Sequence, residues 1–304
     1  MSAPIDLTGR VAVVTGSGRG LGRSYALALA AAGTSIVVND IDGEAAAETA
    51  ELVRSAGGRG VVVVAPVGSS ETADELVATA VREFGRLDVM VANAGVLRDS
   101  VVWKTTDENF DLVVQTHLRG TFTCGRAAAV HFREAGEGGR IILVGSPAGQ
   151  FGNFGQTAYS ASKAGIVAMA RTWSLELARA EVTVNAIIPT AMTPMVATMP
   201  IYAEAYDKFV AGESIPTAIR QGHALGSPDD VAPLVVWLAS ERSAGVTGQA
   251  IGLGGDRLTL YSHPAVLETR DAEGGWTAEG IDAVWASDLA PHVQPSGPTF
   301  APLD

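Results

Sequence analysis

The sequence predicts an α/β protein with a Rossmann-type, doubly wound parallel sheet of about seven strands and helices on both faces. Three observations support this prediction. Short β-branched runs alternate with longer alanine-rich stretches, the runs are almost wholly apolar, and a glycine-rich turn joins the first run to the first stretch. Strands that are apolar on both faces are typical of parallel sheets covered by helices. Repeated β-α units wind such a sheet through right-handed crossovers.

The strands are expected at 11–15, 35–39, 60–65, 87–92, 140–145 and 182–188, with a last short strand near 248–252. The helices are expected at 20–32, 43–56, 70–84, 106–134, 157–180 and 228–240. Residues 1–256 therefore form a single predicted domain. Its segment 189–227 is rich in proline and includes a short helix at 201–212. This long connection follows a strand at its carboxyl end, where such folds place a substrate lid. We expect residues 257–304 to be a C-terminal extension and not an independent domain.

Composition excludes several classes of protein. The chain has 304 residues, 47% of them hydrophobic, which supports one large core. The single cysteine, Cys124, leaves no internal disulfide framework and indicates a reducing cytoplasm. The first ten residues lack the pattern of a signal peptide, and no apolar run is long enough to span a membrane. A formal net charge of −12 argues against nucleic acid and anionic membranes as partners. His131, His223, His263 and His292 show no ligand spacing, so no metal site is expected.

The turn TGSGRGLG, residues 15–22, predicts a site for a dinucleotide. The strict G-x-G-x-x-G pattern is absent, but Gly16, Gly20 and Gly22 stand between a strand and a helix. Glycines there allow positive-φ turns and close approach of the backbone, and a pyrophosphate meets free N–H groups at the helix N-terminus. A glycine-rich turn without a ligand is the alternative.

Asp40 makes a bound dinucleotide the better interpretation of that turn. It ends the second predicted strand, 18 residues after Gly22, where an acidic residue can accept both hydroxyls of an adenosine ribose. A carboxylate would also repel a 2′-phosphate, by roughly 4 kcal/mol at about 4 Å and an effective dielectric constant near 20. Arg19 in the turn offsets part of that repulsion. The sequence therefore favours NAD, with NADP less favoured.

Tyr159 and Lys163 are the leading candidates for acid–base chemistry. Four residues apart on a predicted helix, they share one face, and Ser146 follows the fifth strand 13 residues earlier. Tyrosine is a poor base at its ordinary pKa of about 10. A cation within about 4–6 Å favours the phenolate and lowers such a pKa. Lys163 can supply this charge, and Ser146 can donate a hydrogen bond to a substrate oxygen.

The chain resembles the short-chain dehydrogenase/reductase superfamily over about residues 7–256. The resemblance rests on the glycine turn, the triplet Asn93-Ala94-Gly95, Ser146 and the Tyr159/Lys163 pair, in this order. A closer resemblance is to the (3R)-hydroxyacyl-CoA dehydrogenase domains of type 2 peroxisomal multifunctional enzymes and their bacterial relatives. It is carried by the segments VVND (37–40), NAGVLRD (93–99), HLRGTF (117–122), GNFGQ (152–156) and VAPLVVWL (231–238). This resemblance implies NAD, interconversion of a hydroxyl and a keto group, and a homodimer or homotetramer.

The resemblance also assigns roles to residues. The catalytic set would be Ser146, Tyr159, Lys163 and, at the position of the family's catalytic asparagine, His117. The cofactor contacts would come from Thr15, Gly16, Arg19, Gly20, Leu21, Gly22, Asp40, Ser69, Asn93, Ala94, Gly95, Tyr159, Lys163, Pro189, Ala191 and Thr193. The chain departs from the family pattern at three places. Gly68 and Ser69 stand where an aspartate often meets adenine, and Pro189-Thr190 stands where the family has Pro-Gly after the sixth strand. The third is His117, which could relay a proton, bind a water or only pack.

These patterns predict an NAD-dependent oxidoreductase that interconverts a secondary alcohol and a ketone, with a 3-hydroxyacyl-CoA as substrate. The first alternative is the same chemistry in a 3-ketoacyl-carrier-protein reductase or a steroid or alcohol dehydrogenase. A remote alternative is a non-catalytic, NAD-binding regulator. The partners expected are thus a small hydroxy or keto substrate, an acyl thioester in the leading case, and further copies of the chain.

Overall fold

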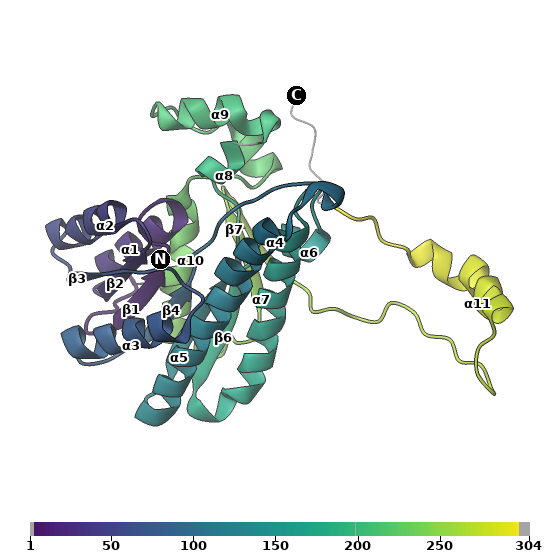
Figure 1. Cartoon of the computed structure of the whole chain (residues 1–304), viewed down its shortest axis with the longest axis horizontal. Coiled ribbons are helices and arrows are strands. Elements are labelled where there is room, and N and C mark those ends of the chain that lie inside the picture. Colours follow the sequence, from purple (N-terminus) through teal and green to yellow (C-terminus); the bar gives the residue numbers. More distant parts are fainter. Residues whose placement is uncertain (1–2, 198, 298–304) are drawn as a thin grey trace.

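The computed structural model describes residues 3–197 and 199–297, which form an eight-stranded sheet between two layers of helices (Figure 1). The strand order is β3-β2-β1-β4-β5-β6-β7-β8, in which β8 alone is antiparallel to its neighbour. The predicted fold class is confirmed. The strands span Val11–Thr15 (β1), Ser35–Asp40 (β2), Gly60–Val64 (β3), Val89–Ala92 (β4), Gly139–Val144 (β5), Val182–Pro189 (β6), Ala250–Gly254 (β7) and Arg257–Tyr261 (β8).

Two apolar cores lie on opposite faces of the sheet. One face is covered by α1 (Gly20–Ala31), α2 (Gly43–Ser55) and α10 (Pro228–Ala239). The other is covered by α3 (Ser70–Phe84), α5 (Gly120–Ala135) and α7 (Thr157–Glu176). The central strands therefore bury the side chains of both faces, which explains why their sequences are apolar runs and do not alternate.

The predicted helix at 106–134 is interrupted. It comprises α4 (Asp107–Val114), a π-helical segment at Gln115–Arg119 and α5. Such π segments insert one extra residue per turn and often occur at functional sites. Here the segment carries His117, which is 1% exposed. Two short helices that were not predicted separately are α6 (Ala148–Phe151) and the 3₁₀ turn Val102–Lys104.

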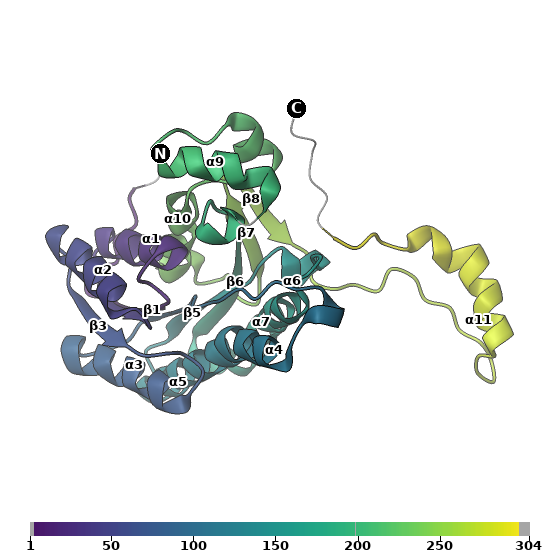
Figure 2. The same cartoon turned by 45° about the horizontal axis from the view of Figure 1, so that its top comes forward.

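The segment 189–227 forms a cap over the carboxyl end of the sheet (Figures 1 and 2). It contains α8 (Pro194–Ala197), α9 (Pro200–Val210) and a π turn at Ala218–Gly222. The cap has a small apolar cluster of its own, and the hydroxyl of Tyr202 lies 2.7 Å from Nδ1 of His223 inside it. Arg220 fastens the cap to the body through Asp230 and Asp256.

The residues after β7 depart most from expectation. Residues 257–261, predicted as part of the extension, join the sheet as β8 along its edge. Beyond Tyr261 the chain leaves the body and folds into α11 (Ala278–Val284), a π turn at Trp285–Leu289 and a 3₁₀ turn at Ala290–His292. Figures 1 and 2 show that these residues project away from the rest of the molecule.

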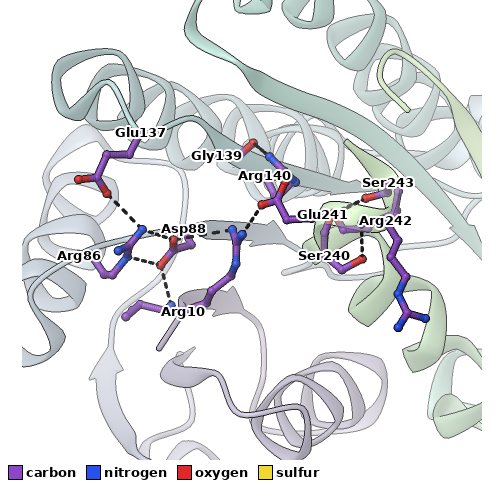
Figure 3. Close-up of polar contacts among 12 residues, drawn as sticks. Arg10, Arg86, Asp88, Glu137, Gly139, Arg140, Ser240, Glu241, Arg242 and Ser243 are labelled. Atoms are coloured by element: carbon purple, nitrogen blue, oxygen red, sulfur yellow. Dashed lines mark hydrogen bonds and ion pairs between the residues drawn. The ribbon is translucent and has the colours of Figure 1, made fainter. Parts of the chain in front are cut away.

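At the amino ends of β1, β4 and β5 a cluster of ion pairs joins the sheet to its surroundings (Figure 3). Asp88 is its buried centre. The carboxylate accepts two hydrogen bonds from the guanidinium of Arg86, at 2.7 and 2.8 Å, and one from the backbone N–H of Val11 at 2.9 Å. Glu241 begins the 3₁₀ turn Glu241–Ser243 that follows α10, and it pairs with Arg10 and with Arg140. The cluster thus links three neighbouring strands to the turn after α10.

We predict that Asp88→Asn lowers the free energy of unfolding by about 2–4 kcal/mol, because it leaves arginine side chains without a buried anion. Urea unfolding measures this change. The matched control is Glu137→Gln, which removes the other carboxylate that pairs with Arg86 but is 65% exposed. We expect it to change stability by less than about 0.5 kcal/mol. Equal stability of Asp88→Asn and the control would contradict this account.

Candidate active site

The candidate site lies where the carboxyl ends of β1, β4, β5 and β6 meet, because these strands are neighbours in the sheet. The chain order reverses between β1 and β4, and open α/β sheets bind ligands at such a switch point. The loop after β1 carries the glycine turn, the loop after β4 carries Asn93, and the loop after β5 carries Ser146. The three loops therefore lie at the same edge of the sheet.

The glycine turn is packed too tightly for side chains at two positions. A Cβ atom on Gly16, whose φ is +61°, would lie 2.7 Å from Cα of Ala94. A Cβ atom on Gly22 would lie 2.1 Å from the carbonyl oxygen of Gly16. The first helix begins at Gly20, and its N-cap residue Arg19 makes no capping hydrogen bond with its side chain. The first N–H groups of α1 are thus left for a pyrophosphate, and the turn fits a dinucleotide.

Thr15 and Asn93 hold the loops after β1 and β4 together. The hydroxyl of Thr15 accepts hydrogen bonds from the backbone N–H groups of Asn93 and Ala94, at 2.9 and 3.1 Å. The side-chain amide of Asn93 donates to the carbonyls of Thr15 and Gly16, at 2.9 and 3.0 Å. The resemblance assigns Thr15 to the phosphate turn and Asn93 to the cofactor cleft, and in the structure these two residues join the two loops.

Asp40 ends β2 beside the glycine turn. One of its carboxylate oxygens accepts from the backbone N–H of Gly18 at 2.9 Å, and the other accepts from that of Asp42 at 3.1 Å. Arg19 does not pair with Asp40. Its guanidinium bonds to the carboxylate of Asp42 at 2.5 Å, although the arginine side chain remains 73% exposed.

Ser146, Tyr159 and Lys163 come together as the sequence predicted. The side chain of Ser146 lies close enough to the Tyr159 hydroxyl to act on its pKa, and it accepts a hydrogen bond from the N–H of Ala148 at 3.2 Å. Nζ of Lys163 donates to the carbonyl of Val144 at 2.6 Å and lies 5.5 Å from the centre of the Tyr159 ring. All three side chains are buried.

Gly149 lets this arrangement form. A Cβ atom at Gly149 would lie 2.6 Å from backbone atoms of Lys163 and Ala164, so α6 packs directly on the backbone of α7. The close packing brings the serine loop against the tyrosine helix.

Burial controls the protonation of this pair. It raises the pKa of Tyr159, and the hydrogen bond from Ser146 acts in the opposite direction without cancelling it. It also lowers the pKa of Lys163 to about 7. The expected lowering of the tyrosine pKa by Lys163 is therefore not found: burial raises that pKa, and the Asp99 charge adds to the rise. Tyr159 thus keeps its proton at neutral pH, and Lys163 loses its proton as the pH rises through about 7.

His117 lies between the cofactor loop and Tyr159. Its Nε2 is 3.0 Å from the backbone nitrogen and 2.7 Å from the carbonyl oxygen of Val96. The ring meets the Tyr159 ring edge-on at 5.1 Å, and a Cβ atom on Gly95 would lie 2.4 Å from its Cε1. Burial lowers the pKa of His117 to about 3, so the imidazole is neutral, and its Nδ1 has no partner among the described residues.

The other predicted cofactor contacts have structural partners of their own. The Ser69 hydroxyl caps α3 by accepting from the N–H of Thr72 at 3.1 Å. Leu21 packs against the core under α1. Pro189 ends β6 at the crevice, and Ala191 is paired with Gly226 in the cap. The carbonyl of Thr193 accepts the N–H of Val196 at the start of the cap.

Sequence reasoning missed Asp99. Its carboxylate accepts a hydrogen bond from the side chain of Gln156 at 2.8 Å, and its charge raises the pKa of Tyr159. Both residues border a narrow pocket that Tyr159 also lines. They stand inside the segments NAGVLRD and GNFGQ, which the sequence singled out only for their resemblance.

Among residues 3–197 and 199–297, no three His, Cys, Asp or Glu side chains are placed to hold a metal ion. Within the same residues no helix is both long and apolar enough to cross a bilayer.

A dinucleotide crevice beside a buried serine, tyrosine and lysine defines an oxidoreductase that acts on CH–OH groups with a nicotinamide dinucleotide. The family model described as short chain dehydrogenase matches residues 10–201. The chain belongs to the short-chain dehydrogenase family.

Curated relatives agree with this assignment. The chain is 39% identical over 281 residues to the hydroxyacyl-CoA dehydrogenase ChsB1 of Mycobacterium tuberculosis, a match covering 88% of this chain and 84% of the relative. It is 38% identical over 250 residues to the peroxisomal multifunctional enzyme type 2 of Mus musculus, covering 79% of this chain but only 31% of that enzyme. It is 37% identical over 256 residues to a 3-oxoacyl-[acyl-carrier-protein] reductase of Synechocystis sp., covering 82% and 97%.

Solved structures agree as well. A short chain dehydrogenase from Mycobacterium avium superposes with a TM-score of 0.82 at 35% identity, covering 99% of this chain and 100% of that one. A short chain dehydrogenase from Mycobacterium paratuberculosis bound to NAD has a TM-score of 0.72 at 31% identity, covering 82% and 98%.

We predict that the stability of the ligand-free protein rises with pH between about 7.5 and 9 because of Lys163. In that range the folded lysine, with a pKa of about 7, has lost its proton, whereas the unfolded one, near 10.4, keeps it. The unfolded state therefore binds one more proton, which raises the free energy of unfolding by about 1.4 kcal/mol per pH unit.

Urea unfolding at several pH values measures this slope. We expect Lys163→Met to remove the contribution, so that its slope falls below that of the wild-type protein by about this amount. The control is Lys208→Met, which removes an exposed lysine and should leave the slope unchanged. Parallel slopes for the wild-type protein and Lys163→Met would show that the buried lysine keeps its proton.

Proposed function

We propose that the chain is an NAD-dependent dehydrogenase that oxidises the 3-hydroxyl of an acyl-CoA thioester to a ketone. The burial of Tyr159 against Ser146 and Lys163, beside the glycine turn, is the observation that carries the proposal. The likeness to the mycobacterial hydroxyacyl-CoA dehydrogenase ChsB1 supports an acyl-CoA as substrate.

The named side chains divide the chemistry among them. Ser146 donates a hydrogen bond to the substrate oxygen, and Tyr159 takes the proton of the hydroxyl. When bound, the oxidised cofactor supplies the hydride acceptor and a positive charge beside the tyrosine. Lys163 would hold the ribose next to the nicotinamide. Thr15, Gly16, Gly20 and Gly22 would hold the pyrophosphate.

The preference for NAD rests on Asp40 and Asp42. Asp40 presents its carboxylate at the end of β2, where a ribose 2′-hydroxyl can donate to it. Asp42 binds the guanidinium of Arg19, the group that could otherwise have balanced a 2′-phosphate. The two carboxylates therefore both disfavour the binding of NADP relative to NAD.

His117 is assigned a positioning role. The backbone nitrogen and the carbonyl oxygen of Val96 both lie within hydrogen-bonding distance of Nε2 of His117. The neutral ring fills the space beside Gly95, where a side chain would clash with it. A group with a pKa near 3 is a poor proton carrier at neutral pH. His117→Asn should accordingly keep the pH profile of kcat, whereas loss of one limb of the profile would indicate proton transfer.

A homodimer or homotetramer forms part of the proposal. On α7, Ala161, Ala168 and Thr172 are exposed, which rules out packing of these side chains on the sheet. On α4 and α5, Phe110, Leu112 and Phe122 are exposed as well. These helices line one open hollow, and a second copy packed there would bury the apolar side chains. Light scattering tests this, and a monomer at micromolar concentration would contradict it.

We place the protein in a reducing cytoplasm. The only cysteine is buried, and burial raises the pKa of its thiol to about 12, so Cys124 is inert to oxidation.

Substrate panels followed at 340 nm, with NAD and NADP side by side, test the proposal. We expect NAD to be reduced with a (3R)-hydroxyacyl-CoA, and Tyr159→Phe to lose at least about 10³-fold in kcat because the base is gone. Binding of NAD should persist in this variant. The control Tyr261→Phe changes a tyrosine at the sheet edge, outside the site, and should keep its activity.

The outcomes separate the alternatives. Full turnover by Tyr159→Phe would exclude the mechanism. Activity only on carrier-protein thioesters with NADPH would indicate a 3-ketoacyl-carrier-protein reductase. Activity only on steroids or free alcohols would indicate a steroid or alcohol dehydrogenase. NAD binding without turnover of any substrate would indicate a regulator.

A further inference from the structure

The loop after β3, residues 65–69 and here called the β3 loop, lies against the π-helical segment Gln115–Arg119, here called the π segment. The carbonyl of Gly68 accepts two hydrogen bonds from this segment. One comes from Nε2 of Gln115 at 3.1 Å and the other from Nε of Arg119 at 2.9 Å. Gly68 is buried, whereas both donor residues are exposed. Two side chains four residues apart thus hold a single carbonyl of the loop.

Two glycines let the β3 loop and the π segment meet at the backbone. A Cβ atom on Gly68, whose φ is +110°, would lie 2.6 Å from Nε2 and 2.9 Å from the carbonyl oxygen of Gln115. A Cβ atom on Gly120, directly after the segment, would lie 2.7 Å from Cγ2 of Val67. A side chain at either glycine would therefore push the loop away from the segment.

The β3 loop lies on the side of the cofactor crevice opposite Tyr159. The N–H of Ala65 donates to the carbonyl of Asp40 at 3.1 Å, so the loop begins beside the residue proposed to bind the ribose. In the sheet, β3 and β2 lie on one side of β1, and β4 and β5 lie on the other. A dinucleotide with its pyrophosphate at the glycine turn and its nicotinamide beside Tyr159 therefore extends its adenine toward the β3 loop.

Only backbone groups of the β3 loop are available to such a base. The loop, Ala65 to Ser69, contains no charged side chain, and the Ser69 hydroxyl already caps α3. Among the residues that the structure describes, the N–H groups of Val67 and Gly68 make no hydrogen bond. Backbone groups cannot be re-aimed by a change of rotamer, so their direction depends on what holds the loop.

We propose that Gln115 and Arg119 are positioning residues for the adenine end of the dinucleotide. By holding the carbonyl of Gly68, they keep the β3 loop in the shape that receives the base before the cofactor arrives. A loop already in its bound shape gives tighter binding, because none of the ligand's affinity is used to order it. This inference concerns the binding of the dinucleotide alone and holds whichever hydroxy substrate the enzyme oxidises.

The π segment also supports the opposite end of the crevice, which helps to design the test. His117 lies midway between Gln115 and Arg119 in the sequence, and its ring contacts Val96 and Tyr159 instead of the β3 loop. A substitution that deformed the whole segment would displace His117 and change kcat. A substitution that only releases the β3 loop should weaken cofactor binding and leave kcat at saturating cofactor unchanged.

Calorimetric titration with ADP-ribose, which has the adenosine but lacks the nicotinamide, tests the proposal. We expect Arg119→Met to weaken the binding of ADP-ribose and of NAD equally, by about ten-fold, because a hydrogen bond from a charged donor is lost. Gln115→Met removes a neutral donor and should weaken both by about three-fold. In both variants KM for NAD should rise by the same factor, with kcat as in the wild-type protein.

The matched control is Arg126→Met. Arg126 lies on α5 and donates to the hydroxyl of Ser70 at 2.8 Å, so this variant removes an equal charge near the β3 loop without touching Gly68. We expect it to change either affinity by less than about two-fold.

Equal weakening by Arg119→Met and Arg126→Met would overturn the proposal, because the loss of charge alone would explain it. Wild-type affinity for ADP-ribose in both Arg119→Met and Gln115→Met would overturn it as well. Failure of the proposed substrate is a separate result, since these titrations contain none.

Discussion

The burial of Tyr159 and Lys163 at the carboxyl edge of the sheet is the constraint on which the rest of the site depends. Removed from water, a phenol and an ammonium group both favour their neutral forms. Burial accordingly raises the pKa of Tyr159 and lowers that of Lys163 to about 7. A protonated tyrosine cannot accept the proton of a substrate hydroxyl. In the proposed mechanism the site therefore needs one more positive charge, which an oxidised nicotinamide held near the tyrosine would supply, and Tyr159 would become a base only with the cofactor bound.

The surrounding structure serves to bring this pair and the cofactor crevice together. The strand neighbours β1, β4, β5 and β6 end side by side, so their loops converge without long connections. Close backbone contacts then set the fine geometry. Gly149 lets the serine loop rest on the tyrosine helix, and Gly16 lets the first turn rest on Ala94. His117, carried on a π segment, fills the space beside Gly95 and supports the tyrosine ring from its edge. A side chain added at any of these glycines would push apart segments that must meet.

The sequence predicted the parts of this protein that depend on local pattern. Apolar runs identified the parallel strands, because a strand covered on both faces shows no polar side. Spacing along the chain also indicated the candidate site. The glycine turn, Asp40 and Ser146 each follow or end a predicted strand, and Tyr159 and Lys163 are one helical turn apart. Other features depend on contacts that spacing does not encode. The π segment at His117 arises inside a continuous helical pattern, and the influence of Asp99 depends on how two loops meet. The strand β8 was taken for part of the extension because a short segment at the sheet edge, with Leu258 and Leu260 exposed, lacks the signature of a buried strand. The direction of the tyrosine pKa shift was also beyond the sequence, since burial and not the lysine decides it.

Direct titration of Tyr159 tests the central claim most closely. Tyrosine labelled with ¹³C at Cζ reports the phenolate by NMR, and the signal of Tyr159 among the five tyrosines is assigned with Tyr159→Phe. The account predicts that the hydroxyl keeps its proton above pH 10 in the free protein, and that bound NAD lowers its pKa by at least about one unit. The same pKa with and without NAD would contradict it.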